Sequence, residues 1–195
     1  QRLDILLLSL FGDARLIGAY SAAYNLVRVA VKLLQSVWRG VYPTLARLYP
    51  TSPDQAMRVA NRLFVWGFAF CTFGALLVSV LATPLLRLVY GVDSGAMESD
   101  ETGSEVATVL AWLIWQAPLF FVELYATTWL LVLLRARAAF GLAMLHLLLL
   151  LLLLPLGALF GGAVGAAWGT LAAQAIAAAG TLWLMRKLIV TLRVS

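Results

Sequence analysis

The stretch YNLVRVAVKLLQSVWRGVYP, from Tyr24 to Pro43, has the Leu, Val and Ala content of a membrane-spanning helix. Three cations, Arg28, Lys32 and Arg39, nevertheless lie within it, and the window holds no acidic residue. Each cation at the centre of a bilayer costs about 2.5–3.5 kcal/mol on insertion scales. A helix that carries three of them must therefore hold them where water or an anion can reach them.

The composition of the whole chain is that of a membrane protein. Of its 195 residues, 63% are hydrophobic and 12% are charged, and the mean hydropathy is +0.95. Soluble domains are usually about 45–50% apolar and about 25% charged. We therefore predict an all-α, polytopic bundle of transmembrane helices. The net charge of +5 does not indicate nucleic acid, because most cations lie in short connections beside apolar runs.

Apolar runs between turn and charge signals predict one truncated span and five complete ones. They cover about residues 1–11, 16–43, 63–89, 106–134, 140–160 and 166–185. The first run has only about half of the roughly 20 residues that a span needs, so we expect the sequence to begin inside a helix of a longer protein. A polar connection is expected from Arg47 to Arg62, because Pro50 and Pro53 should break the helix there. GGAVG, from residue 161, should turn the chain into the last span.

Basic residues occupy alternate connections, as successive crossings of a membrane require. The segment from Gly91 to Glu105 has five acidic residues and no Lys or Arg. Following the positive-inside rule, we expect the basic side and the C-terminus to be cytoplasmic. The cations of the basic side are Arg47, Arg58, Arg62, Arg135, Arg137, Arg186, Lys187 and Arg193.

The cations of the opening stretch share one helical face. An α-helix turns about 100° per residue, so spacings of three and four put Tyr24, Arg28, Lys32, Gln35 and Arg39 in one stripe. Snorkelling to the interface does not account for Arg28, which is about 18 Å from the outer end of its span. The stripe therefore predicts one wall of a water-filled cavity that binds a large anion, such as a phosphate or diphosphate group.

Ion pairing with the stripe is the alternative, and two intramembrane acids are available for it. They are Asp4 on the first run and Glu123, one turn beyond Pro118, where a kink is expected. Two acids cannot neutralise three cations, so Asp4 and Glu123 remain candidates for charge pairing or for ion coupling. His146 is expected to form a hydrogen bond to a neighbouring helix. No metal motif or catalytic nucleophile–base pair is found, so no metal site, cofactor or enzymatic activity is predicted.

Small residues in the last span predict close helix packing. They form a face on which a neighbouring helix can approach the backbone. The residues are Gly161, Gly162, Gly165, Ala166, Ala167, Gly169 and Ala173.

Four motifs carry a resemblance to a known family. They are RLDILLLSLFGDARLIGAYSAAYNLV (residues 2–27), Pro43 at the foot of the next helix, LLRLVYG (residues 85–91) and GGAVGAAWGTLAAQ (residues 161–174). In this order and spacing, the chain resembles the C-terminal half of the lipid-linked oligosaccharide flippases of polysaccharide biosynthesis. These belong to the multidrug/oligosaccharidyl-lipid/polysaccharide exporter superfamily.

The resemblance implies one lobe of a transporter with 12–14 helices and a cationic central cavity that opens alternately to each side. Its substrate would be a polyprenyl-diphosphate-linked sugar or oligosaccharide, moved to the outer leaflet of the bacterial inner membrane. The partners implied are this anionic lipid-linked glycan, membrane lipids and the N-terminal lobe of the same protein. Asp4 matches the acid of the family's Asp-bearing helix, and proton or Na⁺ coupling stays open.

Three other functions are weighed against this one. A purely structural membrane subunit would leave the cationic stripe unexplained. A drug/cation antiporter of the same superfamily would favour acids in its cavity, whereas the stripe is cationic. A membrane ligase or polymerase acting on lipid-linked glycans would favour acids, His or Arg clustered on a long external loop. The segment from Gly91 to Glu105 is short and contains neither His nor Arg.

Overall fold

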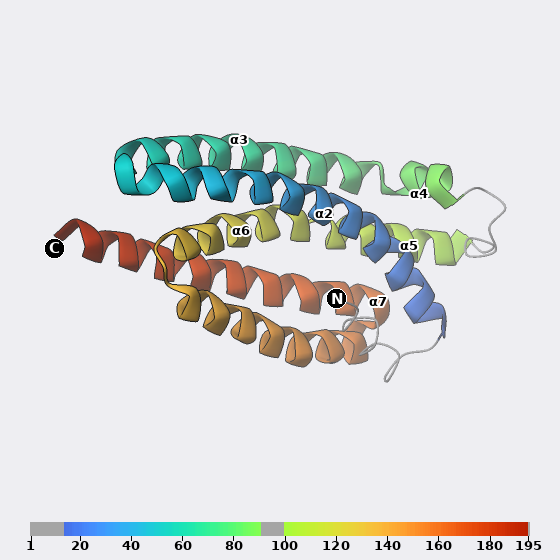
Figure 1. The fold of residues 1–195 in the computed structure, drawn as a ribbon. Coiled ribbons are helices and arrows are strands. Elements are labelled where there is room, and N and C mark those ends of the chain that lie inside the picture. The colour runs from blue at the N-terminus through green and yellow to red at the C-terminus, as the bar shows by residue number, and fades with distance from the viewer. Residues whose placement is uncertain (1–13, 91–99, 195) are drawn as a thin grey trace.

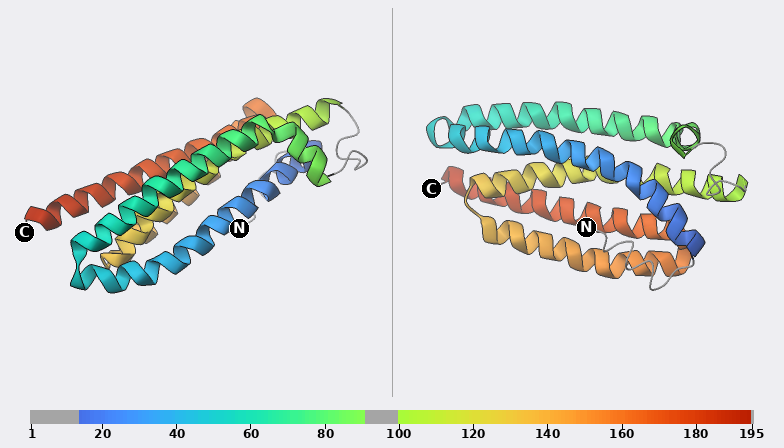
Figure 2. Two further views of the ribbon diagram at one scale, coloured as in Figure 1. Left: turned by 90° about the horizontal axis from the view of Figure 1, so that it is seen from above. Right: turned by 45° about the vertical axis from the view of Figure 1, so that its right-hand side comes forward.

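The computed structural model describes residues 14–90 and 100–194, and these ranges are helical without any strand. The all-α prediction is therefore confirmed for them, whereas Asp4 and the expected span 1–11 lie outside the described residues. The helices run along a common axis, except α4, which crosses it at one end (Figures 1 and 2). Their bounds are α2 Ala14–Thr51, α3 Pro53–Val80, α4 Ala82–Tyr90, α5 Asp100–Leu113, α6 Gln116–Val132 and α7 Ala136–Val194.

Three helical segments of the described ranges are long and apolar enough to cross a membrane. They are Pro53–Val80, Ser104–Val132 and Ala136–Lys187. The first exposes large side chains such as Trp66 at 73% and Phe70 at 76%. An apolar surface of this kind suits contact with lipid. These segments indicate a membrane protein, whereas the number of spans stays a prediction.

The helix break predicted between Arg47 and Arg62 is found at Ser52, but helices occupy the rest of this segment, so the expected extended polar connection is wrong. The helix α2 continues through Pro43 and Pro50 to Thr51, and α3 begins at Pro53 after Ser52. Proline at the first position of a helix loses no hydrogen bond, since that N–H would have no helical partner. Pro50 has no N–H, so the carbonyl four residues earlier lacks its helical donor. Because Pro50 is exposed, water can reach this turn of the helix.

Helix breaks before prolines lie inside two of the predicted spans, and the sequence prediction had expected a kink only at the second of them. The span 63–89 ends at Val80, four residues before Pro84, so the helix long enough to cross is Pro53–Val80. The kink expected near Pro118 is confirmed as the break between α5 and α6, and the segment Ser104–Val132 around it remains long enough to cross a membrane. A proline cannot donate to the carbonyl four residues earlier. For Pro118 that carbonyl belongs to Ile114, which accepts from the Ala117 N–H at 3.0 Å instead.

The predicted turn after residue 160 is confirmed as a sharp reversal inside α7 (Figure 1). Gly162 has φ 57° and ψ −139°, a conformation that is open almost only to glycine. The two halves of α7 then pack backbone to backbone. A Cβ at Gly165 would collide with the carbonyl oxygen of Gly157, and one at Gly169 with that of Leu153. The predicted close packing of the small-residue face is therefore confirmed.

Two clusters of buried side chains form the core, one toward each end of the bundle. The aliphatic cluster joins α2, α3, α4, α5 and α7 and includes Val27, Leu86, Leu110 and Leu154. The aromatic cluster joins α2, α3, α6 and the C-terminal half of α7 around Trp38, Phe121, Tyr125 and Trp129. The face of α2 between Val27 and Trp38 lies between the two clusters, and it is the part that carries Arg28, Lys32 and Gln35.

The basic segments gather at one end of the bundle. The α2–α3 junction, the α6–α7 connection and the C-terminal end of α7 all lie there, while α4, the start of α5 and the reversal of α7 lie at the other end (Figure 1). This arrangement agrees with the alternation of basic connections in the sequence. Which end faces the cytoplasm stays a prediction.

Candidate functional site

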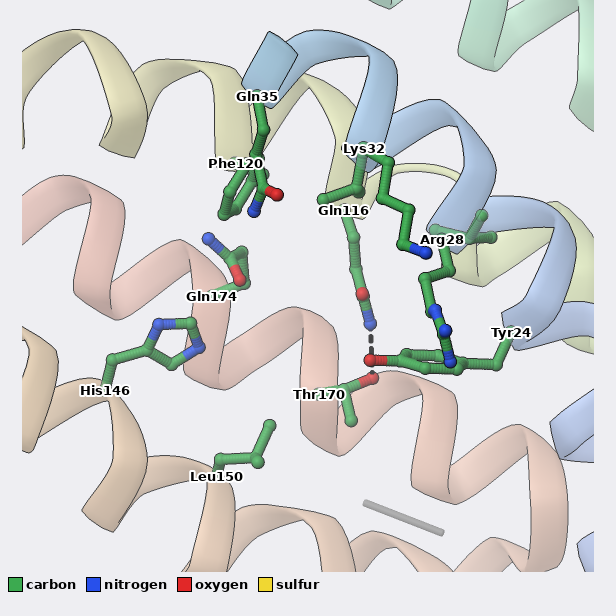
Figure 3. Close-up of a pocket in the computed structure, with 12 residues that line it drawn as sticks. Tyr24, Arg28, Lys32, Gln35, Gln116, Phe120, His146, Leu150, Thr170 and Gln174 are labelled. Carbon is green, nitrogen blue, oxygen red and sulfur yellow. Dashed lines mark hydrogen bonds between the residues drawn. The ribbon is translucent and has the colours of Figure 1, made fainter. Parts of the chain in front are cut away.

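A cavity of about 240 Å³ lies between α2, α6 and α7 (Figure 3). The helix α2 forms one wall, called here the α2 wall, and α6 and α7 form the opposite wall, called here the α6–α7 wall. The lining residues are Tyr24, Val27, Arg28, Val31, Lys32 and Gln35 on the α2 wall, and Gln116, Phe120, His146, Leu150, Thr170 and Gln174 on the α6–α7 wall.

The α2 wall brings together four of the five predicted stripe residues: Tyr24, Arg28, Lys32 and Gln35. Arg39, the fifth, is exposed and does not line the cavity. Figure 3 shows the Arg28 and Lys32 side chains extending from α2 toward Gln116 and Thr170. Within residues 14–90 and 100–194, no carboxylate forms an ion pair with either cation. The α2 wall is thus cationic without a described counter-charge.

The α6–α7 wall is held by hydrogen bonds between side chains of different helical segments. Gln116 Nε2 donates to Thr170 Oγ1 at 2.9 Å, and Thr170 Oγ1 donates to the Ala167 carbonyl at 2.8 Å. Thr170 is only 2% exposed. The bond therefore locks the start of α6 to the second half of α7, and it presents neutral amide and hydroxyl groups to the cavity.

Glu123 stands behind this wall and ties both halves of α7 to α6. Its Oε2 accepts from Gln174 Nε2 at 2.5 Å, and its Oε1 lies 3.3 Å from His146 Nδ1. Glu123 lines a neighbouring cavity of about 190 Å³ with Phe120 and Leu124 instead of the larger one. Its carboxylate is therefore occupied by partners on the same wall.

The structure thus answers some of the predictions for the ionisable residues. The expected hydrogen bond from His146 to a neighbouring helix is confirmed, with Glu123 as the partner. Within the described residues Glu123 pairs with His146 and not with a stripe cation. Asp4 lies outside these residues, so its pairing or ion coupling stays a prediction.

Sequence reasoning predicted no cavity residue on the α6–α7 wall. It did not name Gln116, Thr170 and Gln174, and it did not place His146 at the cavity. A signal was available, because Thr170 and Gln174 are four residues apart and so share a face of α7. Gln116 and Phe120 are likewise four residues apart and share a face of α6. What the spacing did not reveal is that both faces turn toward α2.

No family model, no curated protein and no solved structure matches this chain. The site is therefore interpreted from its own geometry. In the part of the chain that the structure describes, no group of three or more His, Cys, Asp or Glu side chains could hold a metal ion.

Proposed function

We propose that the chain forms one lobe of a membrane flippase that moves polyprenyl-diphosphate-linked sugars or oligosaccharides to the outer leaflet for surface polysaccharide biosynthesis. The observation that carries the proposal is the pairing of two unlike walls around one cavity. Arg28 and Lys32 face it from α2 without a described carboxylate partner, and hydrogen-bonded neutral groups face it from α6 and α7.

The α2 wall suits the diphosphate. The planar guanidinium of Arg28 can donate two parallel hydrogen bonds to phosphate oxygens, and Lys32 adds a compact positive charge. Anion binding also offsets the cost of holding these cations within a membrane bundle. A substrate that supplies negative charge therefore explains why the α2 wall carries cations.

The α6–α7 wall suits neutral polar groups next to the diphosphate. Side-chain amides and hydroxyls both donate and accept, as sugar hydroxyls do. A cavity of about 240 Å³ is below the usual size of a pocket for a drug-sized ligand, about 300–1,000 Å³. It accommodates a charged head group, so the remaining surface around a glycan would come from the expected N-terminal lobe.

Alternating access supplies the mechanism in this proposal. The two lobes rock about the central site and expose it first to the cytoplasm and then to the outer leaflet. The chain would work in the bacterial inner membrane with its basic end and C-terminus cytoplasmic. A drug/cation antiporter fits less well, because Glu123 is occupied by His146 and Gln174 while cations face the cavity.

The test uses the full-length protein in cells that depend on it for surface polysaccharide. The double variant Arg28→Ala/Lys32→Ala should abolish surface polysaccharide at unchanged protein abundance. Arg39→Ala is the matched control, because Arg39 belongs to the same stripe but does not line the cavity. Wild-type amounts of polysaccharide in the double variant would contradict the proposal.

A further inference from the structure

We infer that His146 is a proton-binding site whose protonation is linked to anion binding in the cavity between α2, α6 and α7. The inference rests on the proposed function only in taking this cavity to bind an anion. It assigns to His146 a role that the stripe on α2 does not supply.

Glu123 fixes the orientation of the imidazole ring. Its Oε1 lies 3.3 Å from His146 Nδ1, and its other oxygen accepts from Gln174. The Glu123 side chain is 15% exposed and that of His146 is 23% exposed. In the arrangement that the inference assigns, His146 Nδ1–H donates to Glu123 Oε1, and the lone pair of the neutral imidazole lies on Nε2.

The remaining nitrogen, Nε2, is the one available to the cavity. His146 lines the cavity, and in Figure 3 its ring projects from α7 on the side opposite Arg28 and Lys32. Neutral Nε2 presents a lone pair, which repels a phosphate oxygen. When Nε2 takes a proton from water in the open cavity, it becomes a donor to that oxygen. Protonation therefore changes His146 Nε2 from a hydrogen-bond acceptor into a donor.

The surrounding charges give the linkage its sign. Arg28 and Lys32, with Tyr24, face the cavity from α2, Glu123 contacts His146 from α6, and the second half of α7 contributes the uncharged Thr170 and Gln174. Protonated His146 and the two cations repel one another, and a bound anion offsets this repulsion. Anion binding and proton uptake therefore favour each other, and this linkage is reciprocal.

The experiment measures binding of a P1,P2-dialkyl diphosphate to purified full-length protein by isothermal titration calorimetry. This diester keeps a constant charge between about pH 5 and pH 8, the general range in which histidine as a residue type can change its charge. The wild-type affinity should rise about tenfold as the pH falls through this range, which is an ordinary coupling between two sites. Titrations in two buffers of different ionisation enthalpy should show net proton uptake on binding.

Variants identify the proton-binding group. His146→Gln keeps an amide at the cavity but cannot take up a proton, so its affinity should be independent of pH over this range. Arg39→Gln is the matched control and should keep the wild-type pH dependence. A pH-independent wild-type affinity, or an unchanged pH dependence in His146→Gln, would overturn the inference.

Failure of the proposed function would look different. In that case the wild-type protein would not bind the diphosphate diester at any pH, or Arg28→Ala would bind it as tightly as wild type. Binding that requires Arg28 but takes up no proton would overturn only the role of His146. The number of protons that the wild-type protein takes up on binding is measured without any variant, so this test holds even if His146→Gln does not fold.

Discussion

The two walls of the cavity differ in how their polar groups are satisfied. On the α6–α7 wall, Gln116 bonds Thr170, and Glu123 is bonded by Gln174 and His146. On the α2 wall, Arg28 and Lys32 form no ion pair with any carboxylate in residues 14–90 and 100–194. The polar groups of the α6–α7 wall are thus bonded to one another, whereas the two cations of the α2 wall have no described carboxylate partner and can bind an anion.

This difference separates stability from function. A bonded side chain that loses its partner in a shielded site costs about 1–3 kcal/mol. A cation without a protein partner can be removed without leaving another group unpaired. Substitutions on the α6–α7 wall should therefore lower stability, whereas those on the α2 wall should lower binding. The midpoint of thermal unfolding in one detergent, with unfolding free energies derived from it, tests this division.

The largest effect is expected where the α6–α7 wall is assembled. Gly165→Ala places a Cβ against the carbonyl oxygen of Gly157, which is backbone and cannot rotate away. The two halves of α7 must then separate, and we expect a loss of about 3 kcal/mol, the upper range for overpacking.

Gly141→Ala is the matched control for this change. Gly141 lies in the same helix, α7, and a Cβ added to it would have no neighbouring atom within 4 Å. It should stabilise by about 0.5–1 kcal/mol, because alanine favours the helix over glycine. Equal unfolding temperatures for the two variants would show that the close approach does not matter.

Glu123→Ala should cost about 2 kcal/mol of unfolding free energy. It leaves Gln174 Nε2 and His146 Nδ1 without their acceptor, and Gln174 is only 6% exposed. Glu123→Gln keeps an acceptor oxygen and should lose clearly less. If both variants unfold at the wild-type temperature, the bonds of Glu123 do not stabilise the wall.

Thr170→Val should cost about 1 kcal/mol, because it keeps the shape but removes the acceptor of Gln116 Nε2. Gln116 lines the cavity, so water can replace part of the lost bond. Thr181→Val is the control, since that equally buried hydroxyl donates to Ala177 in its own helix. A larger loss of unfolding free energy in Thr181→Val than in Thr170→Val would show that the bond between Gln116 and Thr170 does not stabilise the wall.

The smallest effect on stability is expected on the α2 wall. Arg28→Gln removes a cation that no described carboxylate neutralises, so the free energy of unfolding should stay within about 0.5 kcal/mol of wild type. Binding of the diphosphate diester should nevertheless fall at least tenfold. A stability loss as large as that of Glu123→Ala would remove the distinction between the walls.

The prolines show how far local sequence reasoning reaches. Pro50 was expected to end a helix, and α2 ends one residue after it. A kink was expected near Pro118 and is found as the break between α5 and α6, whereas Pro84 was passed over although it follows the break between α3 and α4. All three lack the same N–H. Whether the helix continues depends on whether the freed carbonyl finds water or another donor, and that depends on neighbouring helices.

The sequence by itself determined the helical class, the cationic stripe on α2 and the glycines at which α7 reverses. These follow from composition, from spacings of three and four, and from backbone freedom, all of which are local properties. Only the tertiary structure decided that Gln116, Thr170 and Gln174 oppose the stripe, that Glu123 is held by His146 and Gln174, and that Arg39 does not line the cavity. These facts depend on which helices pack together and at what height, and such contacts join residues too far apart along the chain for a local pattern to record.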